Sequence, residues 1–224
     1  MSWISTFLTS SLGKKLIMSL TGLFLITFLI VHLAGNLLLL KGDGGEAFNE
    51  YAYFMTHNPL IKTVSFGLYF FILLHAVLGL LIWVKNREAK GSKYEVANKN
   101  PEIGWASKNM ALLGILILAF LFIHMGDFWY KMKFTDQLKL DANGYKDLYD
   151  AVLTSFKEGW IVAAYVIGQL ALGFHLWHGF QSAFQTLGLS HRKYTPLIIA
   201  VGKIFSVAVP AAFAIIPLFY YFVL

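Results

Sequence analysis

Histidines inside long apolar segments are the residues of this sequence that could do chemistry. The segment 159–188 is long enough to cross a bilayer, has no Lys, Arg, Asp or Glu, and contains His175 and His178. An ionisable side chain in hydrocarbon is costly, so such residues usually serve a function. Histidines in four separate apolar segments predict the ligation of metal centres. The other three segments contain His32, His75 and His124.

Five apolar segments must position these histidines, and each reaches the roughly 20 residues that a membrane-spanning helix needs. Of the 224 residues, 58% are apolar and 13% are charged, and the mean hydropathy is +0.63. This composition is typical of a membrane domain and not of a soluble one. We therefore predict an all-α membrane protein, with residues 1–224 forming a single five-helix bundle. The predicted spans are residues 16–40, 60–84, 109–130, 159–187 and 195–223.

Cysteine content and charge narrow the possible functions. The sequence has no cysteine, which excludes a disulfide, an iron–sulfur cluster held by this chain and a covalently attached c-type haem. Its net charge of +6 comes from residues between the apolar spans, which indicates membrane topology and contact with lipid, not nucleic acid. The first apolar run is too long for the core of a cleavable signal peptide.

Basic residues between the spans predict the orientation. With the N-terminus in the cytoplasm, the inner side carries ten Lys or Arg residues and the outer side seven. Because basic residues favour the cytoplasmic side, we predict a protein of the bacterial cytoplasmic membrane with its N-terminus inside and its C-terminus outside. The basic inner loop 86–107 would suit a docked partner. Outside, we expect a short surface helix within 41–58 and a polar, acidic loop at 132–157.

Positions along the spans place the histidines at two depths. A helix rises 1.5 Å per residue, which puts His32 and His124 roughly 25 and 24 Å from the inner edge. His75 lies roughly 15 Å from that edge, and His175 and His178 lie roughly 18 and 14 Å from it. The spacing predicts an outer pair, His32 with His124, and an inner pair, His75 with either His175 or His178.

Two histidines at each depth are what a b-type haem needs, because two axial imidazoles complete an iron already held by porphyrin. A zinc or di-iron site would use three or four ligands, usually including carboxylates. We therefore predict two b haems stacked within the bundle. Gly35, Gly79 and Gly179 follow a predicted ligand by three or four residues. They would leave room for the macrocycle, or serve helix packing equally well.

Local sequence adds a resemblance to a known family. The first span reads TGLFLITFLIVHLAGNLL, with Gly22 ten residues before His32, and the fourth reads FHLWHGFQSAFQTLG, with His175 four residues before Gly179. The segments LLHAVLG and FIHMGDFW are weaker matches. With five spans and a histidine in each of the first four, the chain resembles the single-subunit dihaem cytochrome b, b558 type, of succinate:quinone oxidoreductases. That family includes the quinol:fumarate reductases.

The resemblance implies specific ligands and partners. Haem would be ligated by His75 with His175 near the cytoplasmic side and by His32 with His124 near the outer side. A flavoprotein with covalent FAD and an iron–sulfur protein would dock on the cytoplasmic face, linking the respiratory chain to the tricarboxylic acid cycle. Dicarboxylate chemistry would occur on the flavoprotein, and menaquinone would be the quinone. The second histidine of HLWHG, His178, departs from some family members.

Other polar residues are weaker candidates. Glu50 and Asp127 could exchange protons with quinone at the outer face, although both also fit ordinary interfacial acids. His57 and His191 fall in loops, where we expect them to be solvated. His178 is interpreted as a residue beside the inner ligand or its propionates. Further candidate propionate partners near the inner side are Ser19, Lys108, Asn109 and Arg192.

Two other classes of protein remain open from the sequence. One is a dihaem cytochrome b that serves a hydrogenase or a formate dehydrogenase, in which the histidines would be distributed differently. The other is a proton-coupled transporter that uses intramembrane histidines as a relay. Such a relay would ordinarily recruit Asp or Glu within the spans, and these spans have almost none.

Overall fold

The computed structural model describes residues 2–89 and 104–223, and almost all of these residues are helical. The described part contains no strand and only one isolated bridge, between Leu140 and Lys146. The basic residues Lys90, Lys93 and Lys99 of the predicted inner loop lie outside it. The helices are α1 Trp3–Thr9, α2 Ser11–Leu37, η1 Leu38–Lys41, α3 Glu46–His57, α4 Pro59–Ala89, α5 Trp105–Lys108, α6 Met110–His124, η2 Met125–Tyr130, α7 Lys131–Phe134, α8 Leu148–Phe156, α9 Gly159–Thr186 and α10 Thr195–Phe222.

Five helical stretches are long and apolar enough to cross a membrane, which is the number predicted from the sequence. The first begins earlier than expected because the Ser10 side chain caps α2 by accepting a hydrogen bond from the backbone N–H of Gly13. The third continues past α6 through the π-helical turn η2 into α7. The five stretches are Ser11–Lys41, Pro59–Glu88, Met110–Phe134, Gly159–Thr186 and Thr195–Phe222.

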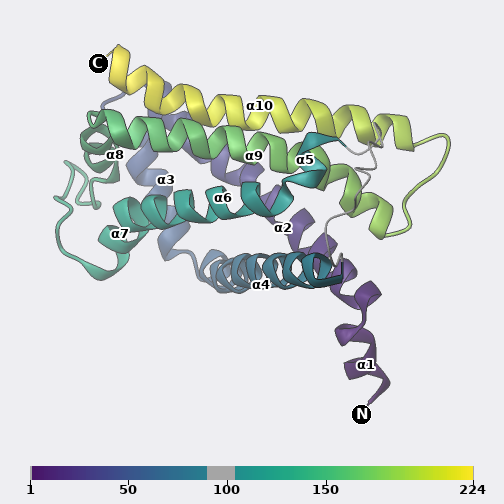
Figure 1. Ribbon diagram of the computed structural model, residues 1–224. Coiled ribbons are helices and arrows are strands. Elements are labelled where there is room, and N and C mark those ends of the chain that lie inside the picture. The colour runs from purple at the N-terminus through teal and green to yellow at the C-terminus, as the bar shows by residue number, and fades with distance from the viewer. Residues whose placement is uncertain (1, 90–103, 224) are drawn as a thin grey trace.

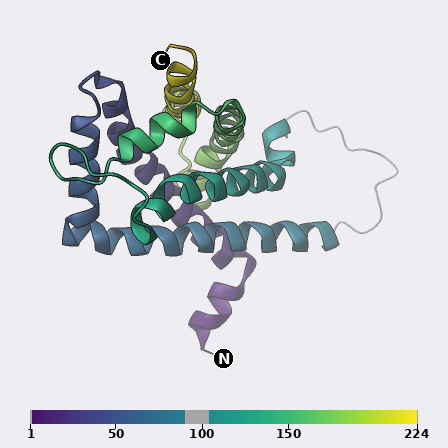
Figure 2. The ribbon, with the colours of Figure 1, turned by 90° about the vertical axis from the view of Figure 1, so that its left-hand side faces the viewer.

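Helix α9 is the centre of the bundle. It packs along α10 and also contacts α6 and α2 (Figure 1). It is the most enclosed of the five, since 39% of the residues in its most apolar 18-residue stretch are buried. Small residues such as Gly168 and Ala171 let the neighbouring helices approach closely. In helix α4 none of the residues of the most apolar 18-residue stretch is buried. Figure 2 views α9 and α10 nearly end-on and α4 along its length, so α4 is steeply inclined to both.

One end of the bundle is closed by a hydrophobic cluster. Phe48 of α3, Val152 and Phe156 of α8, and Tyr220 of α10 are all buried there. The prediction of a polar loop over 132–157 was therefore incomplete, because its second half forms α8 and buries an apolar face. Figure 1 shows α3, α7 and α8 gathered at this end, away from the N-terminus.

A buried asparagine joins the connections at this closed end. Asn49, on α3, donates hydrogen bonds from Nδ2 to Asp141 Oδ2 at 3.2 Å and to Asp147 Oδ1 at 2.9 Å. Its Oδ1 accepts from the backbone N–H of Tyr149 at 3.0 Å. Only 2% of Asn49 is exposed. Since Asp147 also caps α8, this one amide orients α3, the 141–147 turn and α8 together.

Replacing Asn49 with Leu should lower the free energy of unfolding by about 2–4 kcal/mol, because Asp141 and Asp147 each lose one hydrogen bond and the N–H of Tyr149 loses its acceptor. Thermal unfolding in detergent should show a lower melting temperature, and proteolysis should cut residues 135–147 faster. Glu50→Gln is the matched control, since Glu50 is the exposed neighbour on the same helix. Equal melting temperatures for Asn49→Leu and Glu50→Gln would contradict this role.

Candidate functional site: two pairs of histidines between helices

His32 of α2 and His124 of α6 form the first pair, nearer the closed end of the bundle. Their ring centroids lie 5.7 Å apart, with the rings at 83° to one another. Phe28 stacks on His32 at 5.1 Å, and Phe120 stacks on His124 at 5.6 Å. Phe213 of α10 lies 5.5 Å from His32. Aromatic neighbours on α2, α6 and α10 therefore surround the two imidazoles.

His75 of α4 and His175 of α9 form the second pair, with ring centroids 6.1 Å apart and an interplanar angle of 66°. The depth argument left His175 and His178 open as partners of His75. The structure places His175 against His75. His178 instead lines a pocket with Ser107, Gln181 and Lys203.

A hydroxyl group fixes the orientation of the His75 ring. The Thr21 hydroxyl donates its single hydrogen to the backbone carbonyl of Ile17 at 2.8 Å. The hydroxyl also lies 3.1 Å from the carbonyl of Met18 and 3.1 Å from His75 Nδ1. With its hydrogen assigned to a carbonyl, the oxygen is left to accept a hydrogen bond from Nδ1–H. That tautomer leaves the lone pair on Nε2, the form that binds a metal. Gly22 makes the approach possible, since a Cβ there would lie 3.3 Å from His75 Cε1.

The other rings differ in their Nδ1 partners. Tyr165 Oη lies 3.1 Å from His124 Nδ1, and Asn36 Nδ2 lies 3.4 Å from His32 Nδ1. His175 Nδ1 is buried and has no hydrogen-bond partner among the described residues. Within residues 2–89 and 104–223, none of the four rings makes a hydrogen bond through Nε2. The geometry therefore leaves the metal-binding nitrogens of both pairs uncommitted.

The separation within each pair suits a metal between the rings. An imidazole nitrogen lies about 2 Å from a bound first-row metal, so two rings on opposite sides of one metal have centroids about 6 Å apart. The two pairs, at 5.7 and 6.1 Å, are close to this separation. Among the described residues, no group of three or more His, Cys, Asp or Glu side chains comes together. Each pair thus offers two ligands, which is what an iron already held by a porphyrin requires.

Glycines near the pairs differ in what occupies the space beside them. A Cβ on Gly79 would meet only the methyl of Met18, at 3.7 Å, and one on Gly179 only the methyl of Met110, at 4.0 Å. Flexible methionine ends leave adaptable space next to the His75–His175 pair. A Cβ on Gly35 would overlap the ring of Tyr51, so this glycine serves packing of α3. The clearest room for a macrocycle is therefore beside the His75–His175 pair, while aromatic rings pack closely around the His32–His124 pair.

The predicted propionate partners do not converge on one place. Ser19 is buried on α2 and donates to the carbonyl of Lys15 at 2.9 Å. Asn109 donates to the carbonyl of Trp105 at 2.9 Å, and Lys108 and Arg192 are exposed. Within the described segments, no hydrogen bond or ion pair joins any two of Ser19, Lys108, Asn109 and Arg192.

The two acids predicted to exchange protons occupy different environments. Glu50 is exposed on α3. Asp127 lies in the π-helical turn η2, three residues after His124, and forms an ion pair with Lys131 at 3.1 Å. Its second oxygen, Oδ2, is buried without a partner in the described part of the chain. Asp127 is therefore the acid of the two that the fold brings near a histidine pair, and π-helical turns occur frequently at functional sites.

Three residues of interest were missed in the sequence. Thr21 and Tyr165 were missed as partners of histidine because they lie on different helices from the rings that they contact. Lys203 could have been found from the sequence, because it is the one charged residue in the apolar segment 195–223 and charged residues within such segments usually serve a function. His57 and His191 are exposed, as expected, but His57 is the last residue of α3 and does not lie in a loop.

Comparison with known proteins identifies no relative. No protein-family model matches the sequence, and no curated protein and no solved structure matches it. The structure itself defines the class: an all-helical chain with five helices able to cross a membrane and two pairs of histidines between those helices. Function is therefore inferred from the geometry of the pairs.

Packing around the first pair predicts opposite effects for two glycine substitutions. In Gly168→Ala the new Cβ would lie 2.6 Å from Phe120 Cγ, at the base of the ring that stacks on His124. We expect a loss of about 1–3 kcal/mol in the free energy of unfolding, measured by thermal unfolding in detergent.

The matched control is Gly114→Ala on α6, where nothing lies within 4 Å of the new Cβ. Alanine in an open helical position should leave stability unchanged or raise it by up to about 1 kcal/mol. Equal destabilisation by Gly168→Ala and Gly114→Ala would show that contact with Phe120 is not the cause.

Proposed function

We propose that this chain is the membrane-anchor cytochrome b subunit of a succinate:quinone oxidoreductase or quinol:fumarate reductase, carrying electrons between an iron–sulfur subunit and menaquinone by means of two bis-histidine b haems. The observation that carries the proposal is the meeting of imidazoles from different helices in two pairs, with centroids 5.7 and 6.1 Å apart. The sequence resemblance assigns the same two pairs as ligands.

The residues of the chain have separate tasks in this function. His32 with His124 and His75 with His175 would hold the two haems, each of which supplies reversible one-electron transfer when bound. Thr21 holds the His75 ring in the tautomer that frees Nε2. Such hydrogen bonds to ligand histidines orient the ring and tune the metal.

Proton exchange with quinone needs an acid near one of the pairs. Asp127 is the better placed candidate, since its carboxylate lies in the turn that follows His124 and has an unpartnered oxygen. Glu50, exposed on α3, could act only at the surface of that end. By the basic-residue count, this end faces the outside of a bacterial cytoplasmic membrane.

Partner subunits would dock at the opposite end. That end carries the N-terminus, and among its described charged residues it has seven Lys or Arg against one acid, Glu88. The dicarboxylate chemistry would take place on a flavoprotein with covalent FAD, and electrons would reach this chain from its iron–sulfur partner. The end therefore corresponds to the cytoplasmic face on which these partners are proposed to sit.

Counting haem in histidine variants tests the proposal directly. A reduced-minus-oxidised absorbance spectrum of the purified chain should show a b-type α-band, with two haems per chain. His175→Ala and His124→Ala should each lose one haem, because each removes one ligand of a different pair. A wild-type chain without this band would exclude any dihaem cytochrome b.

His178→Ala is the matched control, since His178 lies on α9 three residues from His175 but contributes to neither pair. It should retain two haems. Loss of a haem from His178→Ala with two retained in His175→Ala would reverse the ligand assignment. Copurification of a flavoprotein and an iron–sulfur protein distinguishes the proposed complex from one with a hydrogenase or a formate dehydrogenase.

The hydrogen bond from His75 to Thr21 makes a prediction about redox potential. Thr21→Val should retain both haems but remove the acceptor of Nδ1–H, which makes His75 a less basic ligand. A weaker donor stabilises the oxidised iron less, so the midpoint potential of that haem should rise by some tens of millivolts in a spectroelectrochemical titration.

Thr27→Val provides the control for this change. Thr27 lies on the same helix, is exposed and bonds only to the carbonyl of Leu23. Its potentials should match those of the wild type. Unchanged potentials in Thr21→Val would mean that this hydroxyl does not tune the site.

A further inference from the structure

Lys203 is a cation within an apolar helix and has no acidic partner in the described chain. It lies eight residues after the start of α10, which is roughly 12 Å along the helix from that end. The two ion pairs of the described residues involve other lysines. Among the described residues, Lys203 has one charge-related contact, with the face of Trp177, 5.5 Å from Nζ to the ring centroid. A cation at this depth without a counter-charge favours an anionic partner.

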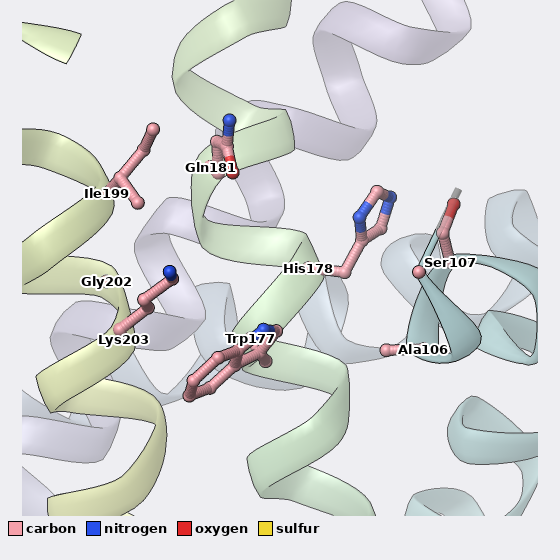
Figure 3. A pocket seen from close by; sticks show the side chains of 9 residues that line it. Ala106, Ser107, Trp177, His178, Gln181, Ile199, Gly202 and Lys203 are labelled. Carbon is pink, nitrogen blue, oxygen red and sulfur yellow. The ribbon is translucent and has the colours of Figure 1, made fainter. Parts of the chain in front are cut away.

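Lys203 borders a pocket of about 190 Å³ that runs across α9. Figure 3 shows its side chain extending from α10 towards α9, with Gln181 and Trp177 beside it and with His178 facing Ser107 further along. The amide of Gln181 and the hydroxyl of Ser107 can donate hydrogen bonds, and among the described residues no acidic side chain lines the pocket. This lining is suited to phosphate oxygens.

An apolar hollow adjoins this polar pocket. Trp105 of α5, with Phe174 and Trp177 of α9, lines it, and the two cavities share Gly104, Ala106 and Trp177. The outward-facing side chains Trp105 and Phe174 are about half exposed, at 58% and 50%. A polar pocket continuous with an exposed apolar groove suits an amphiphile, with its head at Lys203 and a chain along α9.

The charge around the pocket matches an anionic headgroup. The pocket lies at the bundle end that carries the N-terminus, together with Lys108, Arg192 and Lys193. The leaflet facing the cytoplasm is negatively charged, and basic pockets between helices on that side bind anionic lipid headgroups. The positive charge of Lys203 favours such a lipid over a neutral amphiphile.

We infer that the pocket between α5, α9 and α10 binds the phosphate of an anionic phospholipid, with Lys203 as its counter-charge and one acyl chain along Trp105, Phe174 and Trp177. The inference does not require haem in the histidine pairs. Such a lipid would join α10 to the α9 helix that carries His175.

The test is lipid retention by the purified full chain. The chain in non-ionic detergent is equilibrated with phosphatidylglycerol or with phosphatidylcholine of the same acyl chains, and bound lipid is counted by native mass spectrometry. Wild type should retain phosphatidylglycerol preferentially. Lys203→Met, which keeps the length but removes the charge, should weaken phosphatidylglycerol binding about tenfold, the loss expected for one charge-assisted hydrogen bond.

Further arms keep the test decisive. Lys193→Met, at the same end but outside the pocket, should bind as wild type does, and Gln181→Leu should weaken binding even if Lys203→Met fails to fold. Equal losses in Lys193→Met and Lys203→Met would overturn the proposal in favour of general surface charge. If inorganic phosphate displaced the bound lipid, the proposal would be overturned in favour of phosphate as the ligand. If Lys203→Met lost bound menaquinone but kept phosphatidylglycerol, it would be overturned in favour of menaquinone.

Discussion

Imidazoles that meet across the gaps between helices are the interaction on which the rest of this structure depends. An unpartnered imidazole in hydrocarbon is costly, and in the interior of the bundle a neighbouring helix can supply a partner. Here the rings lie opposite each other at two levels, 5.7 and 6.1 Å apart. The order of the helices around α9, and the small residues that let them approach, serve to keep these separations.

The surroundings of the two histidine pairs are not equivalent. Aromatic rings enclose the His32–His124 pair, and Asp127 with its ion-paired Lys131 lies in the turn that follows it. Around His75 and His175 the neighbours are glycines and methionine ends. If the proposed haems are bound, this difference in hydrogen bonding and polarity would give them different potentials.

The two ends of the bundle differ just as clearly. At one end α3 and α8 close over a hydrophobic cluster, and the amide of Asn49 holds the connecting turn in place. At the other end the connections are basic, and the Lys203 pocket opens towards lipid between α9 and α10. One end is thus closed by packed side chains and the other is basic, and this asymmetry supports the proposal that partner subunits dock at the basic end.

Periodicity and composition determined much of this protein without coordinates. Continuous apolar runs of membrane-spanning length specify five helices, and the constant rise of a helix is enough to place four histidines at two depths. Depth alone could not separate His175 from His178, because they lie one turn apart and only the direction of packing against α4 distinguishes them. The contacts of Thr21 and Tyr165 with the rings, the helix at 148–156 and the pocket at Lys203 likewise arise from side chains distant in sequence, and only the tertiary structure decides which of these meet.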